Sequence, residues 1–213
     1  MPRYGAPIWL DRVADVSVDT GNHPGSVLPP PGCALPARPQ DAPPPGSALI
    51  SHYGACMGCG TDHPTGLRMQ VVAGEGLTVA GRFTVTEDHQ GAPGLAHGGL
   101  VALAMDEVLG GLGWLLRRPM VTGRLHVEFV RPVRVGESLA LSARVDGVDG
   151  RRIFCSGLAR EGTDEGPVAA RAFAVFVAVP LEHFRRHGRA ADVDAAARAA
   201  SAFGPGGQWD VAP

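Results

Sequence analysis

The chain contains no lysine: all 19 of its basic residues are arginine, against 21 aspartates and glutamates. This absence excludes Schiff-base chemistry and every other mechanism that depends on a lysine amine. The formal net charge is only -2, and no block of like charge occurs along the chain. There is thus no electrostatic footprint for nucleic acid or for an anionic membrane. We expect neither as a partner.

Cysteine is also scarce, and targeting signals are missing. The spacing of the four cysteines is not that of a disulfide framework: Cys33, Cys56, Cys59 and Cys155. The N-terminal segment lacks the basic-then-apolar order of a signal peptide. Asp106, Glu107 and Arg171 interrupt the apolar runs before they reach membrane-spanning length. We therefore expect a cytoplasmic, reducing location.

Proline and glycine are unevenly distributed and divide the chain into three parts. Residues 1–47 form a Pro/Gly-rich N-terminal extension that cannot build a packed core, which predicts an extended or disordered segment. Residues 48–180 carry the apolar periodicity of one domain. Residues 181–213 are rich in alanine and arginine, and they predict a peripheral C-terminal helix followed by a loose tail.

Within the central part, the apolar pattern predicts strands on both sides of one long helix. Apolar residues alternate over 67–71 and 77–85 around a turn at 73–76, which indicates a β-hairpin. Four more strands are expected over 121–130, 139–145, 153–160 and 168–179, with a turn at 147–150. Short turns between successive strands favour an antiparallel sheet, and the helix must cover one of its faces. The predicted fold class is α+β.

The helix itself is chemically unusual. It is expected to begin near His97 and to end near residue 116, and no polar residue occurs between 100 and 105. Such a helix is normally buried. Asp106 and Glu107 interrupt it, and a buried carboxylate is costly unless it is paired or used. This conflict is the clue that the helix carries a functional site.

Two glycines at the start of this helix suggest a second functional element. Gly98 and Gly99 would expose backbone N–H groups at the positive end of the helix dipole, where a developing oxyanion is stabilised. Asp106 lies roughly 13 Å further along the same helix, too far to act on the same carbonyl. A second copy of the helix, antiparallel in a dimer, would bring one helix start beside the other Asp106.

Three stretches of sequence carry a family resemblance. HQGAPGLAHGGLVALAMDEVLG and VTGRLHVEFVRPVRVGE resemble hotdog-fold acyl-CoA thioesterases of the phenylacetate-pathway (PaaI) type, in the 4-hydroxybenzoyl-CoA thioesterase superfamily. CMGCGTDHPTGLRM is similar to a CxxCG…NPxGL entry found in many members. The resemblance covers about residues 52–180. It implies an antiparallel sheet wrapped around a long central helix, and paired protomers with active sites between them, either as a dimer or as a dimer of dimers.

The resemblance also implies an activity and roles for individual residues. The activity is hydrolysis of an acyl-CoA or acyl-carrier thioester, with no cofactor. Asp106 matches the catalytic carboxylate, as general base or as nucleophile. Gly99, together with Gly98, would donate N–H groups to the thioester oxygen. His97 would position the thioester, and Thr122 would hold the attacking water.

The substrate-binding candidates that follow from the resemblance are Gln90, Gly98, Glu107 and Arg131. Gln90 polarises the carbonyl in some members. Glu107 departs from the alanine common in the family, and it would either serve as the base or pair with an arginine of the neighbouring chain. Arg131 is one of several arginines suited to charge-assisted contacts with CoA phosphates.

Three alternatives stay open. A hotdog dehydratase or hydratase would need a catalytic histidine, for which His89 is the candidate. A non-catalytic acyl-thioester binding or regulatory module is the second. The third is metal or redox chemistry at Cys56 and Cys59; a structural zinc needs four ligands, and no second CxxC follows. A turn with small, partly buried cysteines is therefore favoured, and no metal is expected.

Overall fold

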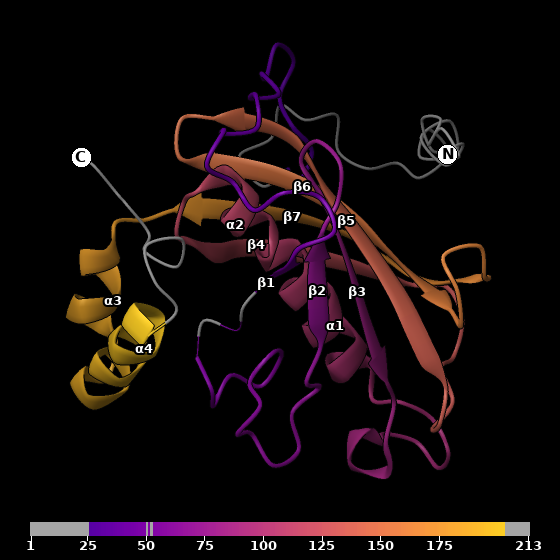
Figure 1. Ribbon diagram of the computed structural model, residues 1–213. Helices are drawn as coiled ribbons and strands as arrows, with labels where there is room; N and C mark the ends of the chain where they lie inside the picture. Colours follow the sequence, from indigo (N-terminus) through magenta and orange to yellow (C-terminus); the bar gives the residue numbers. More distant parts are fainter. Residues whose placement is uncertain (1–25, 50, 52, 203–213) are drawn as a thin grey trace.

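The computed structural model describes residues 26–49, 51 and 53–202, and the elements named below lie in this part of the chain (Figure 1). An antiparallel sheet forms its body, with strand order β1-β2-β3-β5-β6-β7-β4. The strands are β1 (Ala48–Leu49), β2 (Gln70–Ala73), β3 (Thr78–Thr84), β4 (Met120–Phe129), β5 (Ser138–Asp149), β6 (Arg152–Glu161) and β7 (Val168–Ala178). The predicted hairpin and antiparallel sheet are confirmed.

The order of the strands arises because the chain crosses the sheet once, between β3 and β4. β2 and β3 form the hairpin at one side, and the helix then carries the chain to the opposite edge, where β4 pairs only with β7. β5 returns beside β3, and β6 and β7 fill the space between. β4 is thus an edge strand in the described structure.

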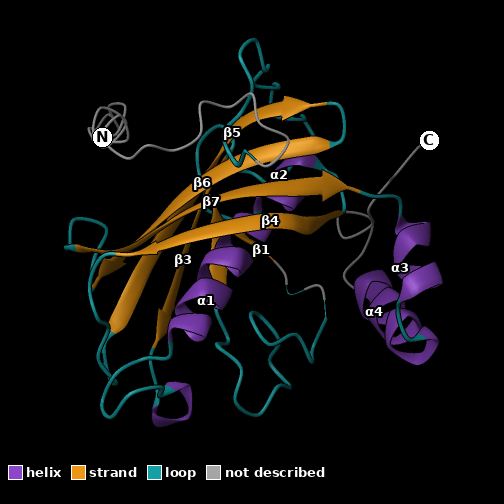
Figure 2. Cartoon of the chain, turned by 180° about the vertical axis from the view of Figure 1, so that it is seen from behind, coloured by secondary structure: helices purple, strands orange, loops and turns teal. Residues whose placement is uncertain are grey.

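The predicted long helix is present but is interrupted once. It consists of α1 (Gly98–Gly110) and α2 (Leu112–Leu116), and Figures 1 and 2 show the sheet curving around it. The break falls at Gly111, where a Cβ atom would lie 3.1 Å from Val71 Cγ1 and 3.2 Å from the Val108 carbonyl oxygen. The close approach of β2 therefore requires a glycine here. Arg117, in the left-handed conformation, ends α2.

The inner face of α1 packs deeply into the core. Its buried residues are Val101, Ala104, Met105, Val108 and Leu109, and the last four are fully inaccessible to solvent. Burial at this spacing supplies most of the stabilisation of such a helix.

β6 makes room for the helix with a glycine. A Cβ at Gly157 would lie 2.8 Å from the Ser142 carbonyl oxygen and 3.1 Å from Met105 Cε. The glycine thus lets the methionine side chain reach the sheet.

Length and composition alone would allow the stretch Gly98–Leu116 to cross a membrane, since its mean hydropathy is 1.5. Asp106 and Glu107 interrupt this stretch, as the sequence-based expectation states. Half of the stretch is buried inside the protein. The core helix of a soluble domain meets the same criterion, because its apolar side chains face the sheet.

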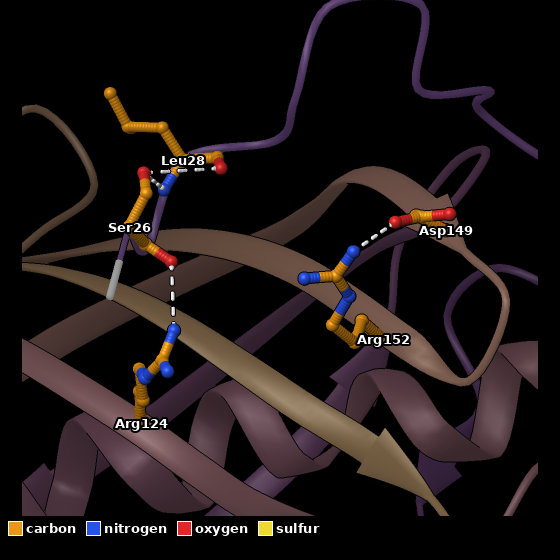
Figure 3. A network of polar contacts seen from close by, with 5 residues as sticks. All are labelled: Ser26, Leu28, Arg124, Asp149 and Arg152. Atoms are coloured by element: carbon orange, nitrogen blue, oxygen red, sulfur yellow. Dashed lines mark hydrogen bonds and ion pairs between the residues drawn. The ribbon is translucent and has the colours of Figure 1, made fainter. Parts of the chain in front are cut away.

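Residues 26–47 of the extension lie against the sheet as a loop with turns at 30–33, 39–42 and 44–47, and the first 25 residues of the extension fall outside the described residues. Ala34 forms an isolated bridge with Val148, and Arg38 donates hydrogen bonds to the carbonyl oxygens of Gly74 (2.7 Å) and Gly76 (2.9 Å). Figure 3 shows another anchor, in which Arg124 of β4 donates to the Ser26 carbonyl oxygen at 3.4 Å. In the same view the Arg152–Asp149 ion pair closes the β5–β6 turn nearby.

Two further boundaries differ from the sequence-based expectation. β5 continues to Asp149 through a bulge between Val145 and Gly147, so the turn expected at 147–150 is confined to its end. The C-terminal part has two helices, α3 (Leu181–His187) and α4 (Ala190–Ala202), where one was predicted. Both lie to one side of the sheet (Figure 2). The predicted tail from 203 onward falls outside the described residues.

Candidate active site

Asp106 and Thr122 meet where α1 passes the edge strand. The Thr122 hydroxyl donates a hydrogen bond of 2.8 Å to Asp106 Oδ1. α1 supplies the carboxylate from its solvent-facing side, and β4 supplies the hydroxyl near its beginning. The pairing of these two predicted residues is therefore present in the structure.

The environment of Asp106 raises its pKa above the ordinary value. Burial is the main cause, because desolvation disfavours the charged form; the nearby Cys56 adds to it, and the hydrogen bond from Thr122 opposes it. A half-buried carboxylate with one hydroxyl donor retains lone pairs to accept a proton from water. The group is thus suited to general-base chemistry.

The start of α1 differs from the simple expectation. His97 is the N-cap, and its Nδ1 accepts a hydrogen bond of 2.9 Å from the Gly99 N–H. The Gly99 amide, predicted to be free for an oxyanion, is therefore occupied by a helix cap. The Gly98 N–H is the first of the helix and lies outside the intrahelical ladder. Gly98 is exposed and is the better placed donor.

The predicted polar side chains of the loop before the helix, Gln90 and His89, form hydrogen bonds within that loop. Gln90 Oε1 accepts a 2.6 Å hydrogen bond from the Gly94 N–H, and Gln90 Nε2 donates to Glu87 at 2.6 Å. The amide therefore shapes this loop in the structure and does not reach toward the helix start. The same is true of His89, which is buried, accepts from the Thr86 N–H and packs edge-on against Phe83. A buried histidine fixed in this way is poorly suited to the base of a dehydratase.

An open pocket of about 300 Å³ adjoins the helix start. Gly98 and Val101 line it from α1, and residues 129–133 line it where the chain leaves β4. Arg131 is among them, so the structure brings this predicted residue to the same pocket as Gly98. Phe129 and Val130 are 57% and 43% exposed, which is unusual for such apolar residues. The sequence pattern predicts that the packing of Phe129 affects the length of the pocket, but it did not single out Val130, which stands directly before Arg131 and Pro132.

Glu107 faces another direction and meets the CxxC turn. Cys56 Sγ donates to Glu107 Oε2 at 3.7 Å, and Ser51 Oγ lies 3.3 Å from Cys59 Sγ. The contact with Cys56, together with burial and the charge of Glu107, raises the pKa of the Cys59 thiol far above its ordinary range. The sequence analysis missed this proximity because Cys56 and Glu107 are 51 positions apart in the chain.

The class of protein follows from the fold together with this site. An antiparallel sheet wrapped around a long helix, with a carboxylate on the helix near the edge strand, is the hotdog arrangement. Residues 93–167 match the model of the thioesterase superfamily. The central part of the chain therefore has the hotdog fold and is similar to the thioesterase superfamily, which confirms the predicted fold class and family resemblance.

Individual proteins show the same similarity. Acyl-coenzyme A thioesterase THEM5 of Mus musculus is 31% identical over 93 residues, which are 44% of this chain and 37% of that protein. THEM4 of Bos taurus is 31% identical over 93 residues, 44% of this chain and 38% of that protein. The chain thus spans less than two fifths of the length of these relatives.

Solved structures extend the similarity beyond that segment. A crystal structure of a thioesterase superfamily protein is 26% identical, with a TM-score of 0.54, and the match covers 83% of this chain and 81% of that one. The PaaI protein of E. coli shares 15% identity and a TM-score of 0.50 over 54% of this chain and 81% of that one, which supports the fold alone.

Proposed function

We propose that this protein hydrolyses an acyl-CoA or acyl-carrier thioester to the free acid and the thiol. The observation that carries the proposal is the half-buried Asp106 carboxylate, oriented by Thr122 at the edge of a domain similar to the thioesterase superfamily. The names of the relatives, acyl-coenzyme A thioesterases, support the substrate class.

In the proposed mechanism Asp106 acts as general base and removes a proton from water. The water oxygen attacks the thioester carbonyl carbon, and the Gly98 N–H stabilises the negative charge that develops on the carbonyl oxygen. The tetrahedral intermediate then breaks its carbon–sulfur bond. The departing thiolate takes the proton from Asp106, which regenerates the carboxylate. Thr122 holds the carboxylate in place throughout.

We further propose that two protomers share each site. Gly98 and Asp106 are eight residues apart on α1, a separation of about 12 Å along the helix axis. Gly98 and Asp106 of one helix therefore cannot act on the same carbonyl. A second helix antiparallel to the first would bring Gly98 of one protomer beside Asp106 of the other. The solvent-facing side of α1, with its half-buried Ala102, Asp106 and Gly110, and the unpaired edge of β4 leave room for such a partner.

The pocket beside Gly98 would then receive the part of the substrate next to the reacting carbonyl. Its exposed apolar wall, Phe129 and Val130, suits a hydrocarbon portion, and Arg131 suits a phosphate. Gln90 is bound within its own loop, and we assign it no contact with substrate.

The test is release of free thiol from a panel of short-chain, long-chain and aryl CoA thioesters, with wild type and Asp106→Asn compared. We expect turnover in wild type and a loss of about 10²–10⁴-fold in the variant. Asp164→Asn, which changes an exposed carboxylate of the β6–β7 turn, is the matched control and should keep wild-type rates. Full activity of Asp106→Asn would contradict the assignment of the base. Binding of the esters without turnover in wild type would instead favour the acyl-thioester binding module.

A further inference from the structure

The turn Cys56-Met57-Gly58-Cys59 is held rigidly by its own backbone and by the chain that leads into β2. The Gly60 N–H donates to the Cys56 carbonyl oxygen, and the N–H groups of Leu67 and Met69 donate to the carbonyl oxygens of Met57 and Gly58, all three at 2.9 Å. The main chain that carries the two cysteines is therefore fixed before any ligand arrives. Such preorganisation lowers the entropic cost of binding.

α1 brings a third donor to this turn. One ligand atom each from Cys56, Cys59 and Glu107 lie within 4.8 Å of one another, although the three residues come from two distant parts of the chain. Gly58 makes this possible, because a Cβ atom at this buried position would collide with the Glu107 carboxylate. The turn thus forms a cradle in which the carboxylate and the sulfur atoms converge.

The distance between Cys56 Sγ and Glu107 Oε2 agrees with that expected for two ligands of one tetrahedral zinc ion. Zinc binds thiolate sulfur at about 2.3 Å and carboxylate oxygen at about 2.1 Å, so a sulfur and an oxygen on one tetrahedral ion are about 3.6 Å apart. Cys56 Sγ and Glu107 Oε2 are 3.7 Å apart. Thiolates favour zinc and other soft or borderline ions over magnesium or calcium.

We propose that Cys56, Cys59 and Glu107 bind one Zn²⁺ ion, with a water molecule in the fourth position. The two thiols release their protons to solvent on binding, and the ion offsets two of the three resulting negative charges. The ion would tie the entry turn to α1 at the residue next to Asp106. The proposal departs from the sequence-based expectation of no metal, and it does not rest on the proposed hydrolysis.

Metal binding to the full-length protein tests it directly. The protein is purified under reducing conditions, stripped with a chelator and titrated with Zn²⁺ alone, with retained zinc measured by elemental analysis. Titration with Co²⁺ reports on the ligands, because cobalt bound to thiolates shows a sulfur-to-metal charge-transfer absorption. We expect one ion per chain and that absorption.

Variants identify the ligands. Cys56→Ser, Cys59→Ser and Glu107→Gln should each weaken Zn²⁺ binding by about 100-fold or more, since each removes one of three ligands. Gly58→Ala leaves all three in the sequence but displaces the Glu107 carboxylate, and it should also weaken binding. Cys33→Ser, which removes a thiol far from the turn in sequence, should bind as wild type.

Two results would overturn the proposal. One is that the reduced wild-type protein retains no zinc and shows no cobalt–thiolate absorption, which would leave the CxxC as a plain turn or a disulfide pair. The other is stoichiometric zinc that survives Cys56→Ser and Cys59→Ser, which would place the ion elsewhere. Circular dichroism of each variant separates loss of a ligand from loss of the fold. None of these measurements depends on thioester turnover.

Discussion

Thr122 Oγ1 lies 2.8 Å from Asp106 Oδ1, and this hydrogen bond joins the central helix to the edge strand of the sheet. The two residues come from elements that meet only because β4 crosses to the far edge before β5 returns. The bond holds the half-buried carboxylate at the protein surface, where water can reach it.

Replacing Gly98 tests the oxyanion donor. Gly98 is the first helical residue and His97 before it is extended, so proline fits this position and removes only the N–H. Gly98→Pro should fold normally and lower kcat by about 10²–10³-fold. Gly98→Ala, whose Cβ would make an ordinary 3.6 Å contact with Phe129, keeps the N–H and should stay active. Equal activity of the two variants would remove Gly98 from the mechanism.

Mixing Gly98→Pro protein with Asp106→Asn protein tests whether two protomers share each site. In a two-fold dimer half of the mixed assemblies are hybrids, and each hybrid has one intact site if Gly98 and Asp106 come from different protomers. Activity should then recover to about a quarter of wild type. No recovery after subunit exchange would place the whole site in one chain.

Thr122 is expected to position the base and to tune it. Thr122→Val keeps the shape but removes the hydroxyl, and the hydrogen bond from Thr122 lowers the pKa of Asp106. The acid limb of the kcat profile should therefore move to higher pH, and the rate should fall by about ten-fold. Thr122→Ser retains the donor and should restore the wild-type profile. An unchanged pH profile in Thr122→Val would show that the bond has no influence on the base.

The raised pKa of Asp106 predicts opposite effects on activity and stability. A base must be ionised, so activity should fall as pH drops through a value above the ordinary 3.8. A raised pKa also means that the folded protein binds this proton more tightly than the unfolded chain. Ionisation of Asp106 therefore costs stability as pH rises from 3.8 through the raised value, and this cost persists above it.

Asp106→Asn should consequently be more stable than wild type at neutral pH, with the difference vanishing below pH 3.8. Thermal unfolding over a pH series, in chelator-treated protein so that no cation occupies the neighbouring Glu107, measures it. A lower Tm for the variant at neutral pH would show that burial does not penalise the charged form.

Substitutions at His97 distinguish a structural role as helix cap from a catalytic role. His97→Ala removes the acceptor for the Gly99 N–H and should lower the free energy of unfolding by about 1 kcal/mol. His97→Asn restores a capping side chain and the stability. If His97 also positions the thioester, the asparagine variant will be stable with a raised KM or a lowered kcat. Wild-type kinetics in His97→Asn would limit the residue to the cap.

Much of the fold was predictable from local pattern. Alternation of apolar residues on both sides of 73–76 indicated the β2–β3 hairpin, because a strand with one buried face carries an apolar residue at every second position. The unbroken apolar stretch before Asp106 indicated a buried helix. The break at Gly111 and the extension of β5 to Asp149 were not predictable. They depend on the approach of Val71 to the helix and on a bulge, which are contacts between distant segments.

The candidate site divides in the same way. Asp106 and Glu107 stood out from the sequence by themselves, since a carboxylate within an apolar helix is a conflict that needs no coordinates to recognise, and the family resemblance singled out Asp106. Only the tertiary structure decided that Thr122 bonds to it, that His97 occupies the Gly99 amide, and that Glu107 faces Cys56 and Cys59. Sequence determines which groups are costly to bury, whereas which groups meet depends on how the sheet folds around the helix.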